Sequence, residues 1–285
     1  YVMSGDAAAM TDNVIGNEDD RWVFTENNPA RELTTAAELA AASRVLKGFN
    51  DTLSVHALKC AQELFEITEQ NNRSKSAKVQ AAVELFLTTG DVKYKNWLLK
   101  ETDFITDNIN RFGWFLGRAE KKINDAEFSK SVRQALHSLR SDLDNQASET
   151  PYGIPYRPHI WGAGWNIQEF GFKHYFLYTA YPDIFEPDYI YNALNFILGC
   201  HPGSNTASFA SGVGANSATV AYGLNRADWS YIPGGVISGT ALIRPDFPEL
   251  LEFPYLWQQV EYVMGGGSSH YMFLVLAAQQ LLNQK

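Results

Sequence analysis

The fold class of this chain is decided by residues 31–49, which read RELTTAAELAAASRVLKGF. Apolar residues recur in this stretch with the i, i+3, i+4, i+7, i+8 spacing of one α-helix face. Thr35 and Glu38 have the spacing of a capping box, which predicts that a helix begins there. The apolar stripe consists of Leu33, Ala36, Ala37, Ala40 and Ala41. These residues predict an amphipathic helix.

The same spacing recurs along most of the chain. Gly90 stops one pattern, and Asp91 can cap the next helix. Residues 150–165, TPYGIPYRPHIWGAGW, contain three prolines and three glycines, which exclude a regular helix. Residues 201–249 predict a long loop, and a last helix begins near Pro254 and is interrupted at residues 265–267. The further helical patterns cover residues 57–65, 79–87, 94–98, 128–143, 167–181, 189–198 and 271–282.

These patterns predict an all-α protein with about nine helices. No sustained period-2 alternation is present, so no β-strand is expected. The links between helices are short, which favours antiparallel helical hairpins. No linker divides the chain, and residues 1–285 are therefore interpreted as one domain.

Charge and composition exclude several classes of partner. The formal net charge is −9, which argues against nucleic acid, whose phosphates attract Lys and Arg. No apolar run reaches about 18 residues, so no membrane span is expected. The chain starts at Tyr1 without an initiator Met or a secretory leader, and we expect it to be cut from something longer. Cys60 and Cys200 allow one disulfide at most, and Cys60 is expected to pack as a small apolar residue.

Glu261 is the most informative single residue. It lies in WQQVEYVMGGG, one helical turn after Trp257 and beside Tyr262. A carboxyl group among aromatic rings loses hydration, which raises its pKa toward that of an acid catalyst. On local sequence alone, a surface glutamate on an amphipathic helix is the simpler interpretation.

Two aromatic and polar segments are candidate ligand-binding regions. Aromatic rings can stack on the flat C–H faces of sugars, and Arg or His can hydrogen-bond hydroxyl groups. A rigid connection packed by its own aromatic residues, or a loop held by an ion pair, explains both segments equally well. The candidate binding residues are Tyr156, His159, Trp161, Trp165, Arg226, Trp229 and Tyr231.

Other chemistries find little support. The six histidines show no HxxxH or HxH spacing, so no His-based metal site is predicted. No phosphate-binding loop and no G-x-S-x-G nucleophile motif is present. Asp12, Asp19 and Asp20 could bind a cation, but a solvated acidic stretch is the better interpretation. No cofactor is expected, and a structural calcium ion is not indicated.

Five segments, taken in order, resemble glycoside hydrolase family 9, the endoglucanase or cellulase family. The resemblance covers roughly residue 21 to the C-terminus, and the order makes it fairly specific. The segments are RWVFTENNPARELTTAAELAAASRVLKGF (21–49), TPYGIPYRPHIWGAGWNIQEFGFKHYFLY (150–178), YIYNALNFILGCHPGSNTASFASGVGANS (189–217), IPGGVISG (232–239) and PYLWQQVEYVMGGG (254–267).

The resemblance implies an (α/α)6 toroid and hydrolysis of β-linked glucans with inversion. In that chemistry an acid protonates the departing oxygen, while a second carboxylate, roughly 6.5–9.5 Å away, activates water. Glu261 takes the place of the acid, and Arg226 that of an arginine beside the cleaved sugar. Family members act on polysaccharides or oligosaccharides, and export to the cell exterior or periplasm is expected.

Two departures from the family pattern stand out. The Asp-Ala-Gly-Asp block that supplies the family's base is not found in this chain, and Asn225 replaces the histidine that precedes the family's arginine. We therefore expect an incomplete toroid that lacks its N-terminal part and its base, so that this missing part of the barrel is itself an expected partner. The alternatives are a non-catalytic glycan-binding remnant on the same fold, or another toroid enzyme such as a polysaccharide lyase.

Overall fold

A computed structural model describes residues 28–69, 71, 74–149, 153–156, 163–200, 208–217, 233–236 and 266–284. Within these ranges the chain is almost entirely helical and forms no strand. Only two isolated β-bridges occur there, Ser208 with Ser217 and Ala210 with Val236. The all-α prediction is therefore confirmed. No helix in the described ranges has the length and apolar character needed to cross a membrane.

Ten helices are described. Their bounds are α1 Pro29–Leu46, α2 Asp51–Ile67, α3 Lys75–Thr89, α4 Val92–Lys100, α5 Thr102–Asp107, α6 Ile109–Ile123, α7 Ala126–Ser148, α8 Ala163–Ala180, α9 Asp188–Ile197 and α11 Gly266–Asn283.

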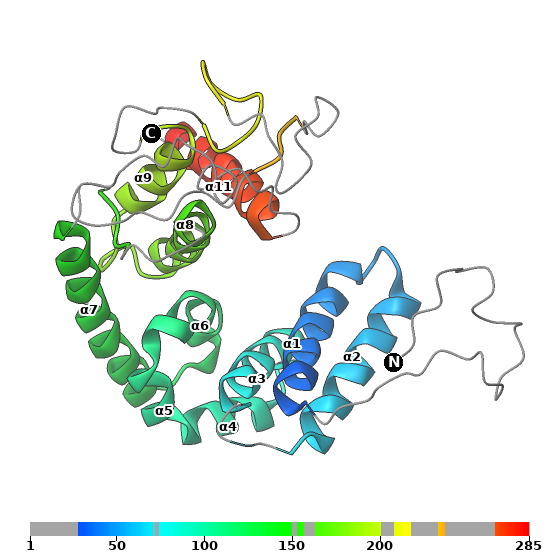
Figure 1. Ribbon diagram of the computed structural model, residues 1–285. Coiled ribbons are helices and arrows are strands. Elements are labelled where there is room, and N and C mark those ends of the chain that lie inside the picture. Colours follow the sequence, from blue (N-terminus) through cyan, green and yellow to red (C-terminus); the bar gives the residue numbers. More distant parts are fainter. Residues whose placement is uncertain are drawn as a thin grey trace, which may run out of the picture.

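The helices follow an open arc from α1 and α2 at one end to α9 and α11 at the other (Figure 1). Five of them, α1, α3, α6, α8 and α11, each contact the next one in this order, and we call them the inner row. The other helices connect successive members of the inner row, as α7 connects α6 to α8, and α7 lies outside α6 in the arc. This alternation is the arrangement expected for part of an (α/α)6 toroid.

The first described helix begins earlier than the sequence predicted. Its N-cap is Asn28, whose side chain accepts a hydrogen bond from the Arg31 amide, and Pro29 follows at the first helical position. The predicted capping box of Thr35 and Glu38 is therefore wrong. Proline needs no amide partner at a helix start, and this allows α1 to begin there. Thr35 lies within the helix.

Cys60 is also not where its pattern suggested. It is exposed on α2, whereas its neighbours Ala57 and Ala61 are buried against the core. The buried face of α2 is narrow and follows residues three or four apart. Cys60 is one position before Ala61 and is therefore rotated about 100° away from the core. The expectation that it packs as an apolar residue is wrong.

The signals at residues 90 and 91 are confirmed. Gly90 ends α3 with a φ of +69°, a left-handed conformation that glycine adopts without strain. The Asp91 side chain then accepts a hydrogen bond from the Lys93 amide at 2.9 Å and caps α4. The sequence alone sets the boundary between these two helices.

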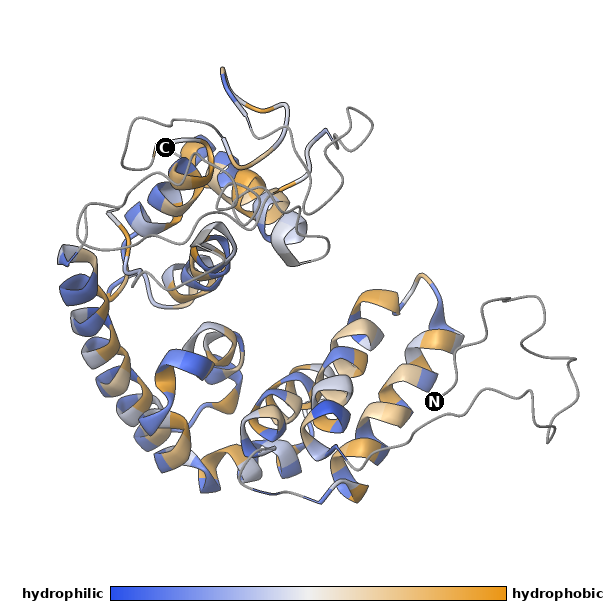
Figure 2. Ribbon diagram, in the orientation of Figure 1, coloured by the Kyte–Doolittle hydropathy of each residue, from blue (hydrophilic) through white to orange (hydrophobic). Residues whose placement is uncertain are grey.

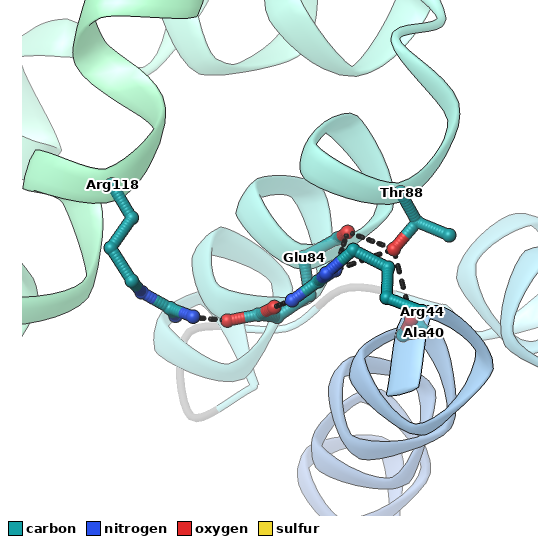
Figure 3. A network of polar contacts seen from close by, with 5 residues as sticks. All are labelled: Ala40, Arg44, Glu84, Thr88 and Arg118. Carbon is teal, nitrogen blue, oxygen red and sulfur yellow. Dashed lines mark hydrogen bonds and ion pairs between the residues drawn. The ribbon is translucent and has the colours of Figure 1, made fainter. Parts of the chain in front are cut away.

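A buried carboxylate joins three helices of the inner row. Glu84 of α3 is 4% exposed and forms ion pairs with Arg44 of α1 and Arg118 of α6 (Figure 3). The Arg44 guanidinium also donates to the Glu84 carbonyl at 2.9 Å, and Thr88 donates to the Ala40 carbonyl at 2.9 Å. We call these residues the Glu84 clamp. A buried charge needs such partners because its lost hydration costs free energy.

His174 of α8 is fully buried beside the α8–α9 connection. Its Nε2 donates to the Glu186 carbonyl at 2.8 Å, and the ring lies against Phe185 and Tyr189. Burial lowers the pKa of His174 from 6.5 to about 4, which outweighs the opposing effect of the hydrogen bond to Glu186. The neutral imidazole is thus the form that the fold stabilises.

We expect acid to destabilise the fold through His174. Since its pKa is lower in the folded chain, stability is lost as the pH falls from 6.5 toward 4, by up to about 3 kcal/mol. Urea unfolding at these two pH values measures the loss. His174→Gln should reduce the pH dependence, whereas His137→Gln, on an exposed position of α7, should leave it unchanged. Equal pH dependence in both variants contradicts the assignment.

Candidate functional site

Two of the predicted site residues lie in the described part of the chain. Tyr156 belongs to the short described segment 153–156, and Trp165 lies in the first turn of α8. The other predicted residues lie outside the described residues, and their roles stay predictions. These are His159, Trp161, Arg226, Trp229, Tyr231 and Glu261.

Segment 153–156 is fixed against α8 and α9. The Asn192 side chain of α9 donates a hydrogen bond to the Gly153 carbonyl at 2.8 Å. Gly153 has a φ of +66°, which only glycine adopts readily, and an added Cβ would lie 3.3 Å from Asn192 Nδ2. Residues 153–156 are therefore held in a defined conformation against α9. Asn192 carried no signal in the sequence, because its partner is 39 residues away.

Tyr156 is 6% exposed and packs in an apolar cluster. Its neighbours in the cluster include Ile154, Ile167 of α8 and Phe196 of α9. This burial supports the interpretation of a rigid, aromatic-packed connection for Tyr156, and a role in sugar binding stays a prediction. Trp165 is half-buried.

A cavity of about 260 Å³ lies beside Tyr156. Gln146 of α7, Asn166 and Phe170 of α8, and Pro155 contribute to its wall. The cavity shows that the end of α7, segment 153–156 and the start of α8 meet at one place. Residues 153–156 of the predicted binding segment thus lie beside the N-terminal part of α8.

A group of half-buried aromatic rings connects α6, α8 and α11. The Trp114 ring of α6 lies 5.5 Å from that of Phe172, and Phe172 lies 5.0 Å from Phe273 of α11, measured between ring centroids. Phe176 stacks on Phe273 at 5.5 Å. These partly accessible rings on three adjacent inner helices were not singled out in the sequence, because only the fold brings them together.

His270 of α11 belongs to the same aromatic group. Its ring lies 4.7 Å from that of Phe172, and burial is the main cause that lowers its pKa, against the charge of Glu169. Phe273, one turn further along α11, contacts both Phe172 and Phe176. The first turns of α11 therefore pack against the middle of α8.

Metal-binding groups are not evident in the described ranges. There, no three His, Cys, Asp or Glu side chains gather in a way that could hold an ion. Asp12, Asp19 and Asp20 lie outside the described residues.

The chain matches one protein-family model, glycosyl hydrolase family 9, over residues 2–223. No curated protein matches the chain.

Several solved structures share the fold. One is a metagenome-derived glycoside hydrolase family 9 endoglucanase, at 17% identity and a TM-score of 0.66, which covers 88% of this chain and 52% of that one. Another is an endoglucanase (D468A) from Alicyclobacillus acidocaldarius, at 16% identity and a TM-score of 0.69, with 88% and 55% covered. The endoglucanase of the termite Nasutitermes takasagoensis has 17% identity and a TM-score of 0.67, with 88% and 66% covered. The chain spans about half the length of the first of these structures.

Proposed function

This chain belongs to glycosyl hydrolase family 9, and we propose that it forms part of an enzyme that hydrolyses β-linked glucans by inversion. Glu261 is the general acid in this proposal. The family match over residues 2–223 is the observation that carries the proposed reaction class, while the role of Glu261, which follows the matched residues, rests on the resemblance of segment 254–267 to the family's last catalytic helix. The endoglucanase names of similar structures support glucan as the substrate class.

The arrangement of α8 and α11 supports a common site for the binding segment and the acid. α8 begins two residues after Trp161, and α11 begins five residues after Glu261. The two helices are in contact, through the first turns of α11 and the middle of α8. We propose that Trp161, Trp165, Arg226, Trp229 and Glu261 line one concave surface there, with Tyr156, His159 and Tyr231 as further binding residues.

The catalytic base is proposed to lie outside this chain. Asp183 is one carboxylate that could be considered instead, but it follows the C-terminal end of α8 and pairs with Arg133 of α7. Since α8 has 18 residues, that end is about 27 Å from its start. Asp183 is therefore poorly placed to act beside Trp165.

Exposed apolar side chains mark both ends of the arc. Phe49 and Leu53, at the α1–α2 end, are 90% and 50% exposed, and Met272 and Leu276 of α11 are 64% and 62% exposed. Figure 2 shows hydrophobic stretches on α2 and α11. The chain covers only 52% of the first similar structure, and we propose that the remaining helices of the toroid pack on these two faces. This missing part is the main proposed polypeptide partner.

The experiment compares this chain alone with the chain joined to a family segment that carries an Asp-Ala-Gly-Asp block. We expect the chain alone to hydrolyse β-glucan very slowly or not at all, because an inverting enzyme without its base cannot activate water. The joined protein should be active in a reducing-sugar assay. A joined protein whose added aspartates are replaced by Asn is the control.

Robust turnover by the chain alone would show that the base is already present. Asp228 and Asp246 would then be tested first, ahead of Asp183. A folded, joined protein without activity on any β-glucan would instead favour a glycan-binding remnant. Cleavage of acidic polysaccharides with formation of an unsaturated product would favour a lyase.

A further inference from the structure

An elongated groove lies between α7 and the corner where α5 meets α6. Its volume is about 750 Å³, within the range typical of ligand sites. The α7 side of the groove extends from Ser131 to Gln146, which corresponds to about 22 Å along the helix. A site of this length fits a linear ligand better than a single sugar ring.

The groove wall is rich in polar side chains that are available to a ligand. Across the described ranges, the six side chains named below form no hydrogen bond or ion pair with the protein, so all can bind a ligand. They are Asp107, Asn110, Ser131, Gln134, Asp142 and Gln146. Amides both donate and accept, and carboxylates accept from hydroxyl groups.

The charge and the floor of the groove restrict its ligand. Neither Lys nor Arg contributes to the lining, and two carboxylates do, so phosphate or an acidic sugar would be repelled. Ile109, Leu139 and Leu143 supply an apolar surface between the polar groups. A neutral chain with many hydroxyl groups and apolar C–H faces fits this lining.

The groove ends close to the described residues 153–156 of the predicted binding segment. Gln146 lines both the groove and the cavity beside Tyr156 and Asn166. The two hollows are therefore neighbours, on either side of Gln146 near the C-terminal end of α7. The groove lies in the middle of the arc, away from the exposed faces of α2 and α11 that are proposed to receive further helices.

We propose that this groove is a second glucan-binding site, which holds a stretch of a neutral polysaccharide chain outside the catalytic cleft. The choice of glucan rests on the proposed function, whereas the preference for a neutral, linear polyhydroxyl ligand rests on the groove itself. A polysaccharide held in this groove lies close to the N-terminal end of α8, where Trp165 is located.

The test is a titration of this chain, carrying Glu261→Gln to prevent turnover, with cellohexaose. Side-chain amide signals of Asn110 and Gln134 in NMR spectra report on the groove. The variant Gln134→Ala with Asp142→Ala should weaken binding measured at the Asn110 signal by roughly 3- to 30-fold, because two hydrogen bonds are lost. The matched control is His137→Ala with Ser141→Ala, two exposed positions of α7 outside the groove lining, and it should bind like the parent.

Each outcome decides the inference. A parent chain whose Asn110 and Gln134 signals do not respond to cellohexaose overturns it, as does equal weakening by the groove and control variants. Hydrolysis by the joined protein without any groove response overturns the second site and leaves the proposed function standing. A groove response together with an inactive joined protein supports the second site and counts against the proposed function.

Discussion

Glu84→Gln is expected to lower the free energy of unfolding by about 3 kcal/mol. The substitution keeps the size of the side chain but removes the charge that holds Arg44 and Arg118. Glu84 is 5% exposed at its side chain, whereas the two arginines are 29% and 33% exposed. Water can partly solvate the two arginine charges once Glu84 is neutral. We therefore expect a loss of stability at the lower end of the range typical of a broken buried ion pair.

Urea unfolding of the wild type and of Glu84→Gln measures this difference. The matched control is Glu63→Gln on α2, where Glu63 pairs with Lys59 and is 58% exposed. Exposed pairs of this kind contribute about 0–1 kcal/mol. A loss in Glu84→Gln no larger than that in Glu63→Gln would show that the Glu84 clamp does not stabilise the inner row.

The helices were predictable because their signals are local. The stripe at residues 33–41 and the glycine stop at residue 90 depend only on neighbours within a few positions, and both agree with the structure. The start of α1 was misplaced, since Thr35 and Glu38 have the right spacing but Asn28 and Pro29 provide the cap. A spacing rule alone does not decide between two nearby caps.

The features that shape the candidate site depend on residues far apart in the chain. Glu84 meets Arg44 and Arg118 across 40 and 34 residues, and Asn192 reaches Gly153 across 39 residues. Local sequence patterns, which span only a few residues, do not indicate which distant residues pair. The family membership was predictable because segments 21–49, 150–178 and 189–217 lie in the family's order within the matched residues 2–223, whereas the catalytic role of Glu261 stays a prediction.

Glu261→Gln should have the largest effect on function. In the joined protein we expect cleavage of a natural β-glucan to fall by about a hundred- to ten-thousand-fold, while glucan binding is kept. Glutamine retains the size and hydrogen bonding of glutamate but cannot deliver the proton that the departing sugar oxygen needs. An aryl glycoside with a good leaving group needs little protonation and should lose much less activity.

Two controls separate this role from a packing defect. Glu169→Gln replaces a partly exposed glutamate of α8 that pairs with Lys173, and it should leave both activities nearly unchanged. Thermal unfolding of Glu261→Gln should match the parent. A defect in packing would lower the melting temperature and reduce both activities alike.

The measurement that tests the central claim most directly is kcat/KM of Glu261→Gln and its parent on a β-glucan and on an aryl β-glycoside. We expect the mutant-to-parent ratio of kcat/KM to be at least about tenfold lower on the glucan than on the aryl glycoside, since only cleavage of the glucan depends on the proton. Equal losses on both substrates in a protein with unchanged unfolding, or full activity on the glucan, would contradict the assignment of Glu261 as the general acid.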